Sequence, residues 1–198
     1  PLTAWGIMCG APGDGYVYCF RGTTDGSAPN TYAAKYEIGS DDPWTAITAL
    51  PTAMMFGDAI AMDGKIYILG GWMAEDTVYS YDPVGDSYTA LDSLTTGRQR
   101  PSVVAAGGML WVAGGGNTWT PTGGTEYFDG TSWTDAASSM LAPVLGGIAG
   151  YLHGYGIFLA GGRDVSFADT AHNQLFQACV PAFDSITPDE GDVGDTVT

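Results

Sequence analysis

The chain has 198 residues, of which 22 are acidic and 6 basic, so its formal net charge is −16. A nucleic-acid-binding protein would carry a basic face, and this excess of acidic residues disfavours that class. The sequence also has no apolar run long enough for a membrane-spanning helix. The partners we expect are therefore a protein or glycan ligand, or other subunits of a larger assembly.

The first strand-sized segments lie near the beginning of the chain. Each is short, rich in β-branched or aromatic residues, and bounded by turn residues. No segment keeps apolar residues at helical spacing over a dozen positions, so the chain is predicted to be all-β. The four strands predicted here are AWGIMCG (4–10), YVYCFRG (16–22), TYAAKYEI (31–38) and PWTAI (43–47).

The next two sets of strands follow the same plan. The second set is predicted at 57–64, 65–71, 77–82 and 87–91, with a tight hairpin turn at Asp63-Gly64. The third set is predicted at 102–108, 109–115, 125–129 and 132–136. In both sets the second strand ends at a glycine doublet, Gly70-Gly71 or Gly114-Gly115. Glycine suits a place where neighbouring second strands pack closely and the chain then turns sharply outward.

A fourth set contains only three predicted strands, at 145–154, 155–162 and 173–180. Its glycine doublet is Gly161-Gly162, and no fourth strand precedes Pro181. The three doublets recur at a period of roughly 45 residues, which is typical of propeller blades or helical arrays. The strand-like composition favours four-stranded antiparallel blades.

Further residues of each set resemble kelch repeats, which build β-propellers. The matching features are aromatic-acidic pairs at 36–37, 81–82 and 128–129, and an aromatic residue several positions later, namely Trp44, Tyr88 and Trp133. The resemblance covers about residues 4–180 and implies blades near 1–50, 51–97, 98–142 and 143–182. We expect these four blades to be part of a six- or seven-bladed propeller in a longer protein, with a complete four-bladed propeller as the alternative.

The C-terminal stretch FDSITPDEGDVGDTVT (183–198) resembles the beginning of an immunoglobulin-like domain of the IPT/TIG type. Its carboxylates do not follow the order of a calcium-binding loop. We therefore expect a solvated interdomain turn rather than a metal site. The acidic residues considered are Asp184, Asp189, Glu190, Asp192 and Asp195.

The chain has three cysteines. A symmetric hairpin turn would pair Cys9 with Tyr16 and Cys19 with Gly6, which would hold the two cysteines beyond disulfide reach. Cys19 is predicted to be a small buried hydrophobic residue, and Cys179 has no evident partner. The cysteines therefore do not indicate a cellular compartment.

No catalytic residue, cofactor or metal site is predicted. The two histidines, His153 and His172, lack the spacing that would place two ligands on one metal. Copper-radical oxidases similar to galactose oxidase combine a kelch propeller with an immunoglobulin-like domain and use a Tyr-His pair. This sequence has no such dipeptide, so that activity is an alternative only for blades outside the chain. Kelch sugar isomerases are a further alternative without a supporting motif.

Binding is the predicted function, because loops on a rigid scaffold commonly carry it. In a propeller, the loops between second and third strands share one face with the connections between blades. Trp and Arg are frequent in binding hot spots, and Trp also stacks on sugar rings. The predicted ligand-binding residues are Trp72, Trp119, Arg98, Arg100 and Arg163. The alternative is that Arg98 caps a strand and the tryptophans pack between blades.

The leading hypothesis is a non-enzymatic adhesion module of an extracellular or particle-surface protein, on a cell envelope, a secreted assembly or a virion. It would recognise a glycan or a protein through the propeller-face loops. An architectural spacer in a large assembly is the second hypothesis, and a cytoplasmic adaptor of the substrate-recruiting kelch type is the third.

Overall fold

The computed structural model describes residues 8–20, 22–23, 27–42, 44–117, 120–136, 143–152, 156–164, 166, 168 and 173–176. Within these ranges every regular element is a β-strand. The strands form three four-stranded sheets, one three-stranded sheet and one small two-stranded hairpin, and all the pairings are antiparallel. The prediction of an all-β chain with four-stranded antiparallel blades is confirmed. No described segment is a helix long and apolar enough to span a bilayer.

The strands of each sheet follow one another in chain order. The first sheet contains β1 (Met8–Gly10), β2 (Tyr16–Phe20), β3 (Ala33–Glu37) and β4 (Thr45–Ala46). The second contains β5 (Asp58–Met62), β6 (Lys65–Leu69), β7 (Val78–Asp82) and β8 (Ser87–Ala90). The third contains β9 (Ser102–Ala106), β10 (Met109–Ala113), β13 (Thr125–Phe128) and β14 (Trp133–Asp135). The three-stranded sheet contains β15 (Ile148–Leu152), β16 (Gly156–Ala160) and β17 (Asn173–Phe176).

Two short strands were not predicted. β11 (Gly116–Asn117) and β12 (Thr120–Pro121) pair as a hairpin within the segment that joins β10 to β13. This hairpin lengthens the loop of the third sheet, and its two residue pairs gave no strand signal in the sequence because they are too few for an alternating pattern.

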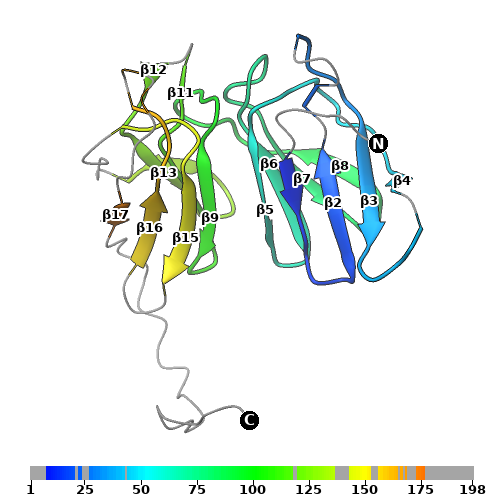
Figure 1. The fold of residues 1–198 in the computed structure, drawn as a ribbon. Coiled ribbons are helices and arrows are strands. Elements are labelled where there is room, and N and C mark those ends of the chain that lie inside the picture. Colours follow the sequence, from blue (N-terminus) through cyan, green and yellow to red (C-terminus); the bar gives the residue numbers. More distant parts are fainter. Residues whose placement is uncertain are drawn as a thin grey trace, which may run out of the picture.

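The sheets stand side by side, and the first strand of each sheet lies next to the first strand of the following sheet (Figure 1). β1 lies beside β5, β5 beside β9, and β9 beside β15. The hydrophobic core fills the spaces between sheets: Tyr18 and Phe20 pack with Ile66 and Ile68, Leu69 packs with Leu110 and Val112, and Trp111 packs with Ile157. The aromatic residue Trp133 is buried and Trp44 is half-buried against Tyr36.

The glycine doublet after β6 has two separate reasons to be glycine. Gly70 and Gly71 have φ values of 65° and 109°, which favour a residue without a side chain. A Cβ atom on Gly70 would lie 2.6 Å from the carbonyl oxygen of Arg98, and one on Gly71 would lie 2.8 Å from that of Met55. The predicted crowding around the two glycines is present, but the prediction of which segment causes it was wrong. The glycines approach the segments that connect the sheets, not the second strand of a neighbouring sheet.

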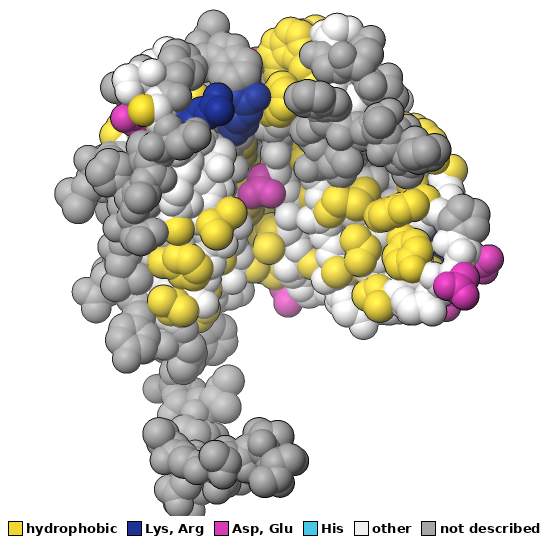
Figure 2. Space-filling model, in the orientation of Figure 1, with side chains coloured by type: hydrophobic (Ala, Val, Ile, Leu, Met, Phe, Trp, Pro, Cys, Tyr) yellow, Lys and Arg dark blue, Asp and Glu magenta, His cyan; other side chains and the backbone are white. Residues whose placement is uncertain are grey.

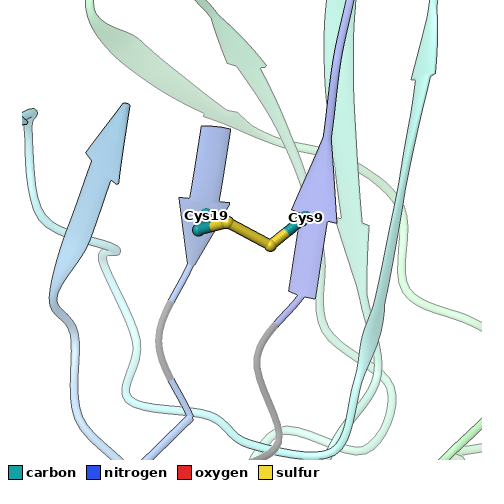
Figure 3. Close-up of a disulfide and its surroundings, with 2 residues drawn as sticks. All are labelled: Cys9 and Cys19. Carbon is teal, nitrogen blue, oxygen red and sulfur yellow. A yellow bond between two sulfur atoms is a disulfide. The ribbon is translucent and has the colours of Figure 1, made fainter. Parts of the chain in front are cut away.

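The prediction that Cys9 and Cys19 cannot reach each other was wrong (Figure 3). The two residues are directly paired across β1 and β2, their Cα atoms are 4.3 Å apart, and they form a disulfide. The loop is centred on Asp14, whose carboxylate accepts hydrogen bonds from the backbone N–H of Tyr16 and the hydroxyl of Tyr18. This shifts the register from the symmetric turn that was assumed.

The predicted burial of Cys19 was also wrong. Cys19 is partly exposed, whereas the matching residues Ile68, Val112 and Leu159 are fully buried. In β2 the alternate side chains, Tyr18 and Phe20, face the second sheet, so Cys19 points to the opposite face.

Several predictions concern residues outside the described ranges. They are the IPT/TIG-like stretch at 183–198 with its acidic residues, both histidines, Cys179 and Trp119. The proposed blade boundaries and the number of blades in a closed propeller also stay predictions.

Candidate functional site

The segments that connect successive sheets pair with the loops that follow the glycine doublets. Isolated bridges join Met55 to Trp72, Gln99 to Gly116 and Leu145 to Arg163. The second residue of each bridge comes directly after a doublet, so the three bridges occupy equivalent places in successive repeats. We call this end of the sheets the loop end; it comprises residues 54–57, 70–77, 98–101, 114–117, 143–147 and 161–164.

A line of backbone hydrogen bonds crosses the loop end from repeat to repeat. The N–H of Arg100 donates to the carbonyl of Phe56 at 2.5 Å, and the N–H of Gly146 donates to the carbonyl of Arg100 at 2.9 Å. All three residues have a positive φ, with values of 62° for Phe56, 51° for Arg100 and 67° for Gly146. The same backbone conformation therefore recurs once per repeat and fixes Arg100 between two neighbours.

A hollow of about 400 Å³ opens beside this line of residues. Its walls come from the beginnings of β5, β9 and β15 and from the connecting segments before them. Figure 2 shows basic side chains gathered above the hollow and an acidic side chain inside it. The lining residues are Phe56, Gly57, Asp58, Arg100, Pro101, Val103, Gly146, Gly147, Ile148 and Ala149.

Two arginines of adjacent repeats lie at the loop end, Arg100 bonded through its backbone to Gly146 and Arg163 to Leu145. The guanidinium of Arg100 lies over the ring of Phe56, with its carbon 4.2 Å from the ring centroid. Partial burial lowers the pKa of Arg100, and the positive charge of Arg163 lowers it further. Arg163 is exposed. The structure thus brings together two of the five predicted ligand-binding residues, from adjacent repeats.

Asp58 supplies an acidic group to the same hollow. Its carboxylate accepts hydrogen bonds from the N–H of Val103 at 3.0 Å and from its neighbour Ala59 at 2.8 Å. Burial raises the pKa of Asp58 to about 6, although these two hydrogen bonds act in the opposite direction. The carboxylate joins β5 to β9, so it has a structural role in addition to its charge.

Arg98 does not face the solvent. Its side chain is 1% exposed and forms an ion pair with Glu126, and its guanidinium also donates to the carbonyls of Gly114 and Gly124. Glu126 further accepts hydrogen bonds from Thr95 and from the N–H of Thr96. This matches the alternative in which Arg98 is structural, and we leave Arg98 out of the candidate site.

The remaining predicted residues are spread along the loop end. Trp72 is half-buried, and its backbone N–H donates to the carbonyl of Met55 at 2.6 Å. The adjacent Met73 is 63% exposed, and Asn117 is exposed in the third sheet's loop. Sequence reasoning gave Met73 no role, because a single exposed apolar residue is not by itself a sign of a binding site.

Among the described residues, no group of three or more His, Cys, Asp or Glu side chains could hold a metal ion. The residues that line the hollow offer one guanidinium group, from Arg100, one carboxylate, from Asp58, and apolar walls. Such an arrangement can bind an anionic group next to an apolar one.

Comparison with known proteins agrees with this architecture. Residues 58–95 match the Kelch motif. The chain is similar to "Kelch repeat and BTB domain-containing protein 1" of Cowpox virus (strain GRI-90 / Grishak), with 32% identity over 123 residues, 59% of this chain and 21% of that protein. It is also similar to "Kelch-like protein terF" of Aspergillus terreus, with 38% identity over 64 residues, 28% of this chain and 14% of that protein.

A second viral relative is "Kelch repeat and BTB domain-containing protein 1" of Cowpox virus (strain Brighton Red), which is 33% identical over 129 residues, 61% of this chain and 22% of that protein. The chain therefore spans about a fifth of the length of the viral relatives it matches. The motif and these relatives support a kelch-repeat domain, and the sheets are consistent with blades of the kelch type. Kelch repeats are generally protein-binding modules, and proteins that contain them are generally binding or adaptor proteins rather than enzymes.

Proposed function

We propose that this kelch-repeat chain is a non-enzymatic module that binds a protein partner through its loop end. The observation that carries the proposal is the repeated bridge between connecting segment and loop, seen at Met55–Trp72, Gln99–Gly116 and Leu145–Arg163. These bridges gather loops of successive repeats on one side and hold their backbones rigidly. Exposed Met73 and Arg163 then form part of a pre-organised surface, which lowers the entropy cost of binding.

We further propose that the module works outside the cell or on the surface of a particle, as an adhesin. The disulfide between Cys9 and Cys19 supports this location, because disulfides persist in oxidising compartments and are rare in reducing ones. The large excess of acidic residues agrees with a highly solvated surface.

The adaptor hypothesis is the second candidate, and the viral relatives favour it. Their names combine kelch repeats with a BTB domain, so in those proteins the repeats are one part of a larger chain. The redox state of Cys9 and Cys19 in the native protein separates the two candidates. An adhesin keeps the disulfide, whereas an adaptor in a reducing compartment keeps both thiols.

The experiment that tests the proposed function is site-specific photo-crosslinking in the intact protein. A photoreactive amino acid replaces Met73 at the loop end or, as the matched control, Val84 in the turn between β7 and β8 at the opposite end. Both side chains are exposed, at 63% and 97%. We expect a defined protein adduct from position 73 and none from position 84.

The other results of that experiment have different meanings. Equal adducts from both positions would contradict binding through the loop end. An adduct between two copies of the chain, or with a fixed neighbour in an assembly, would support the architectural spacer instead. A parallel screen for glycans that protect position 73 from labelling would detect a sugar ligand in place of a protein.

A further inference from the structure

The disulfide between Cys9 and Cys19 joins the central residue pair of β1 and β2. In the other sheets the equivalent pairs of first and second strand are apolar, namely Ala59–Ile68, Val103–Val112 and Ala149–Leu159. The second-strand member of each of those pairs is fully buried, whereas Cys9 is exposed and Cys19 is partly exposed. The disulfide therefore lies where a thiolate in solution can reach it, which is the condition for thiol–disulfide exchange.

In the part of the chain that the structure describes, β1 is the shortest of the four first strands. It pairs with β2 through three residue pairs, whereas β5, β9 and β15 pair with their second strands through five each. The Cα atoms of the two cysteines are 4.3 Å apart, close to the spacing of about 4.5 Å in a narrow pair of an antiparallel ladder. The disulfide thus adds a covalent bond to the strand that has the fewest ladder contacts.

β1 supports the loop end through Met8. This side chain is 1% exposed and belongs to the core between the first two sheets. Its sulfur lies against Gly57, where a Cβ atom would be 2.7 Å from it, and the same Cβ atom would be 2.6 Å from the carbonyl oxygen of Gly70. Gly57 belongs to the connecting segment in which Met55 is bridged to Trp72. A continuous set of contacts therefore runs from β1 to the loop that follows β6.

We propose that the disulfide between Cys9 and Cys19 is a redox latch, which holds β1 on β2 and thereby keeps the loop-end segments 54–57 and 70–77 in order. In the reduced protein β1 is held only by its three residue pairs and by the packing of Met8. It then separates from β2 more often while the other sheets stay folded. The inference rests on the proposed function for its consequence, which is weaker binding of the partner when the loop end is less ordered.

The reductant that opens the latch is a dithiol, either a small molecule or a protein with two neighbouring cysteines. One thiolate of the dithiol attacks a sulfur of the disulfide, a mixed disulfide forms, and the other cysteine leaves as a thiolate. The second thiolate of the dithiol then attacks the dithiol's own sulfur in the mixed disulfide and releases the remaining cysteine. Two electrons pass to the protein, the dithiol becomes a disulfide, and its two protons end on Cys9 and Cys19.

The test is hydrogen–deuterium exchange of the intact protein, either oxidised or treated with dithiothreitol in the absence of denaturant. We expect the reduced protein to exchange about tenfold faster or more in residues 8–20, as for the loss of a short cross-linked loop. Exchange should also become faster in 54–57 and 70–77. Residues 102–113 of the third sheet are the internal reference and should not change. Reoxidation with glutathione disulfide should restore slow exchange.

Two variants separate the latch from other effects of the reductant. The double variant Cys9→Ser with Cys19→Ser should exchange like the reduced protein and should not respond to dithiothreitol. Cys179→Ser is the matched control, because it removes the third cysteine and leaves the pair intact. It should respond to dithiothreitol like the unchanged protein. Mass spectrometry after alkylation reports whether the pair has been reduced in the folded protein.

Four results would overturn the inference. They are a disulfide that dithiothreitol reduces only in denaturant, exchange in residues 8–20 that reduction leaves unchanged, a double serine variant that exchanges like the oxidised protein, and equally faster exchange in all the sheets. The last result would make the disulfide a support of the whole fold rather than of β1.

The exchange measurements need no partner, so their failure and that of the proposed function are distinguishable. The consequence for binding is measured by photo-crosslinking at position 73, where we expect dithiothreitol to lower the yield of the adduct. An equal yield in both redox states would refute the control of binding by the latch. The absence of any adduct, together with the expected exchange, would contradict loop-end binding and support the latch alone.

Discussion

The backbone N–H of Arg100 donates a hydrogen bond of 2.5 Å to the carbonyl of Phe56, and the two residues hold the same place in successive repeats. Both have a positive φ, which is costly for a residue with a Cβ atom. The repeats are thus joined at the loop end by main-chain bonds that depend on backbone conformation more than on side-chain identity.

This relationship predicts different effects for two substitutions that remove the same charge. Arg100→Gly should leave the free energy of unfolding unchanged or slightly raise it, because glycine tolerates a positive φ. Arg100→Val should be less stable than Arg100→Gly by about 1–2 kcal/mol, the cost of a left-handed conformation for a residue with a Cβ atom, which the unchanged arginine also bears. Urea unfolding of the two variants measures the difference. Equal stabilities would show that the residue is not held in this conformation.

The buried pair of Arg98 and Glu126 is predicted to stabilise the fold. Arg98→Ala should lower the free energy of unfolding by about 3–5 kcal/mol, because it leaves a carboxylate buried without its cation. Arg163→Ala, at an exposed position, should change it by less than about 0.5 kcal/mol. Chemical denaturation of both variants gives the comparison. A stable Arg98→Ala protein that has lost its partner would instead restore Arg98 as a binding residue.

The disulfide is predicted to form in the native protein and to contribute to its stability. It closes a loop with a sequence separation of 10, for which chain-entropy models give about 2–3 kcal/mol. The double variant Cys9→Ser with Cys19→Ser should lose that amount, and reductant should destabilise only the unchanged protein. Mass spectrometry after alkylation without reductant should find both residues unmodified. Alkylation at both would contradict the disulfide and the proposed extracellular location.

Asp58 is predicted to make stability depend on pH. Its pKa is raised from 3.8 to about 6 in the folded protein, so the folded state binds the proton more tightly than the unfolded state. Asp58 therefore stabilises the fold less as the pH rises, and the stabilisation is lost above about pH 6. Between pH 4.5 and 7.5 the free energy of unfolding of the unchanged protein should fall by about 2 kcal/mol relative to Asp58→Asn.

The control for this pH dependence is Asp63→Asn. It makes the same change of net charge in an exposed hairpin turn and tolerates the positive φ of 52° there. A protein with this substitution should follow the unchanged protein across the pH range. If Asp58→Asn shows the same slope as the unchanged protein, the carboxylate is not buried as the structure has it.

The repeats and most strands could be predicted because their signals are local. The turn at Asp63-Gly64, for example, directly joins β5 and β6 with Met62 opposite Lys65, as the sequence indicated. Alternation, turn residues and the glycine doublets all act within a few residues of chain. The all-β architecture follows from these signals.

What could not be predicted depends on contacts between distant residues or on a side chain that changes a turn. The pairing of Cys9 with Cys19 depends on the loop that Asp14 centres by its hydrogen bonds. The burial of Arg98 depends on Glu126 in the next sheet. Glu126 stands at the strand position that Tyr79 occupies in the preceding repeat. An acidic residue at such a position was a signal that its carboxylate needs a buried cation as partner.

The placement of Arg100 and Arg163 in neighbouring segments of the loop end was also not visible in the sequence, although both were predicted to bind ligand. They belong to adjacent repeats, and their relative positions are set by the way successive connecting segments pair across the loop end. Sequence spacing gives the repeat to which a residue belongs, but not which segment it meets in the neighbouring repeat.

The measurement that tests loop-end binding most directly is hydrogen–deuterium exchange of the intact protein with and without the partner that photo-crosslinking identifies. We expect the partner to slow exchange in residues 70–77, 98–101, 143–147 and 161–164, and to leave the turns at 63–64 and 83–86 unchanged. Protection at the turns of the opposite end, with unchanged exchange at the loop end, would contradict this function.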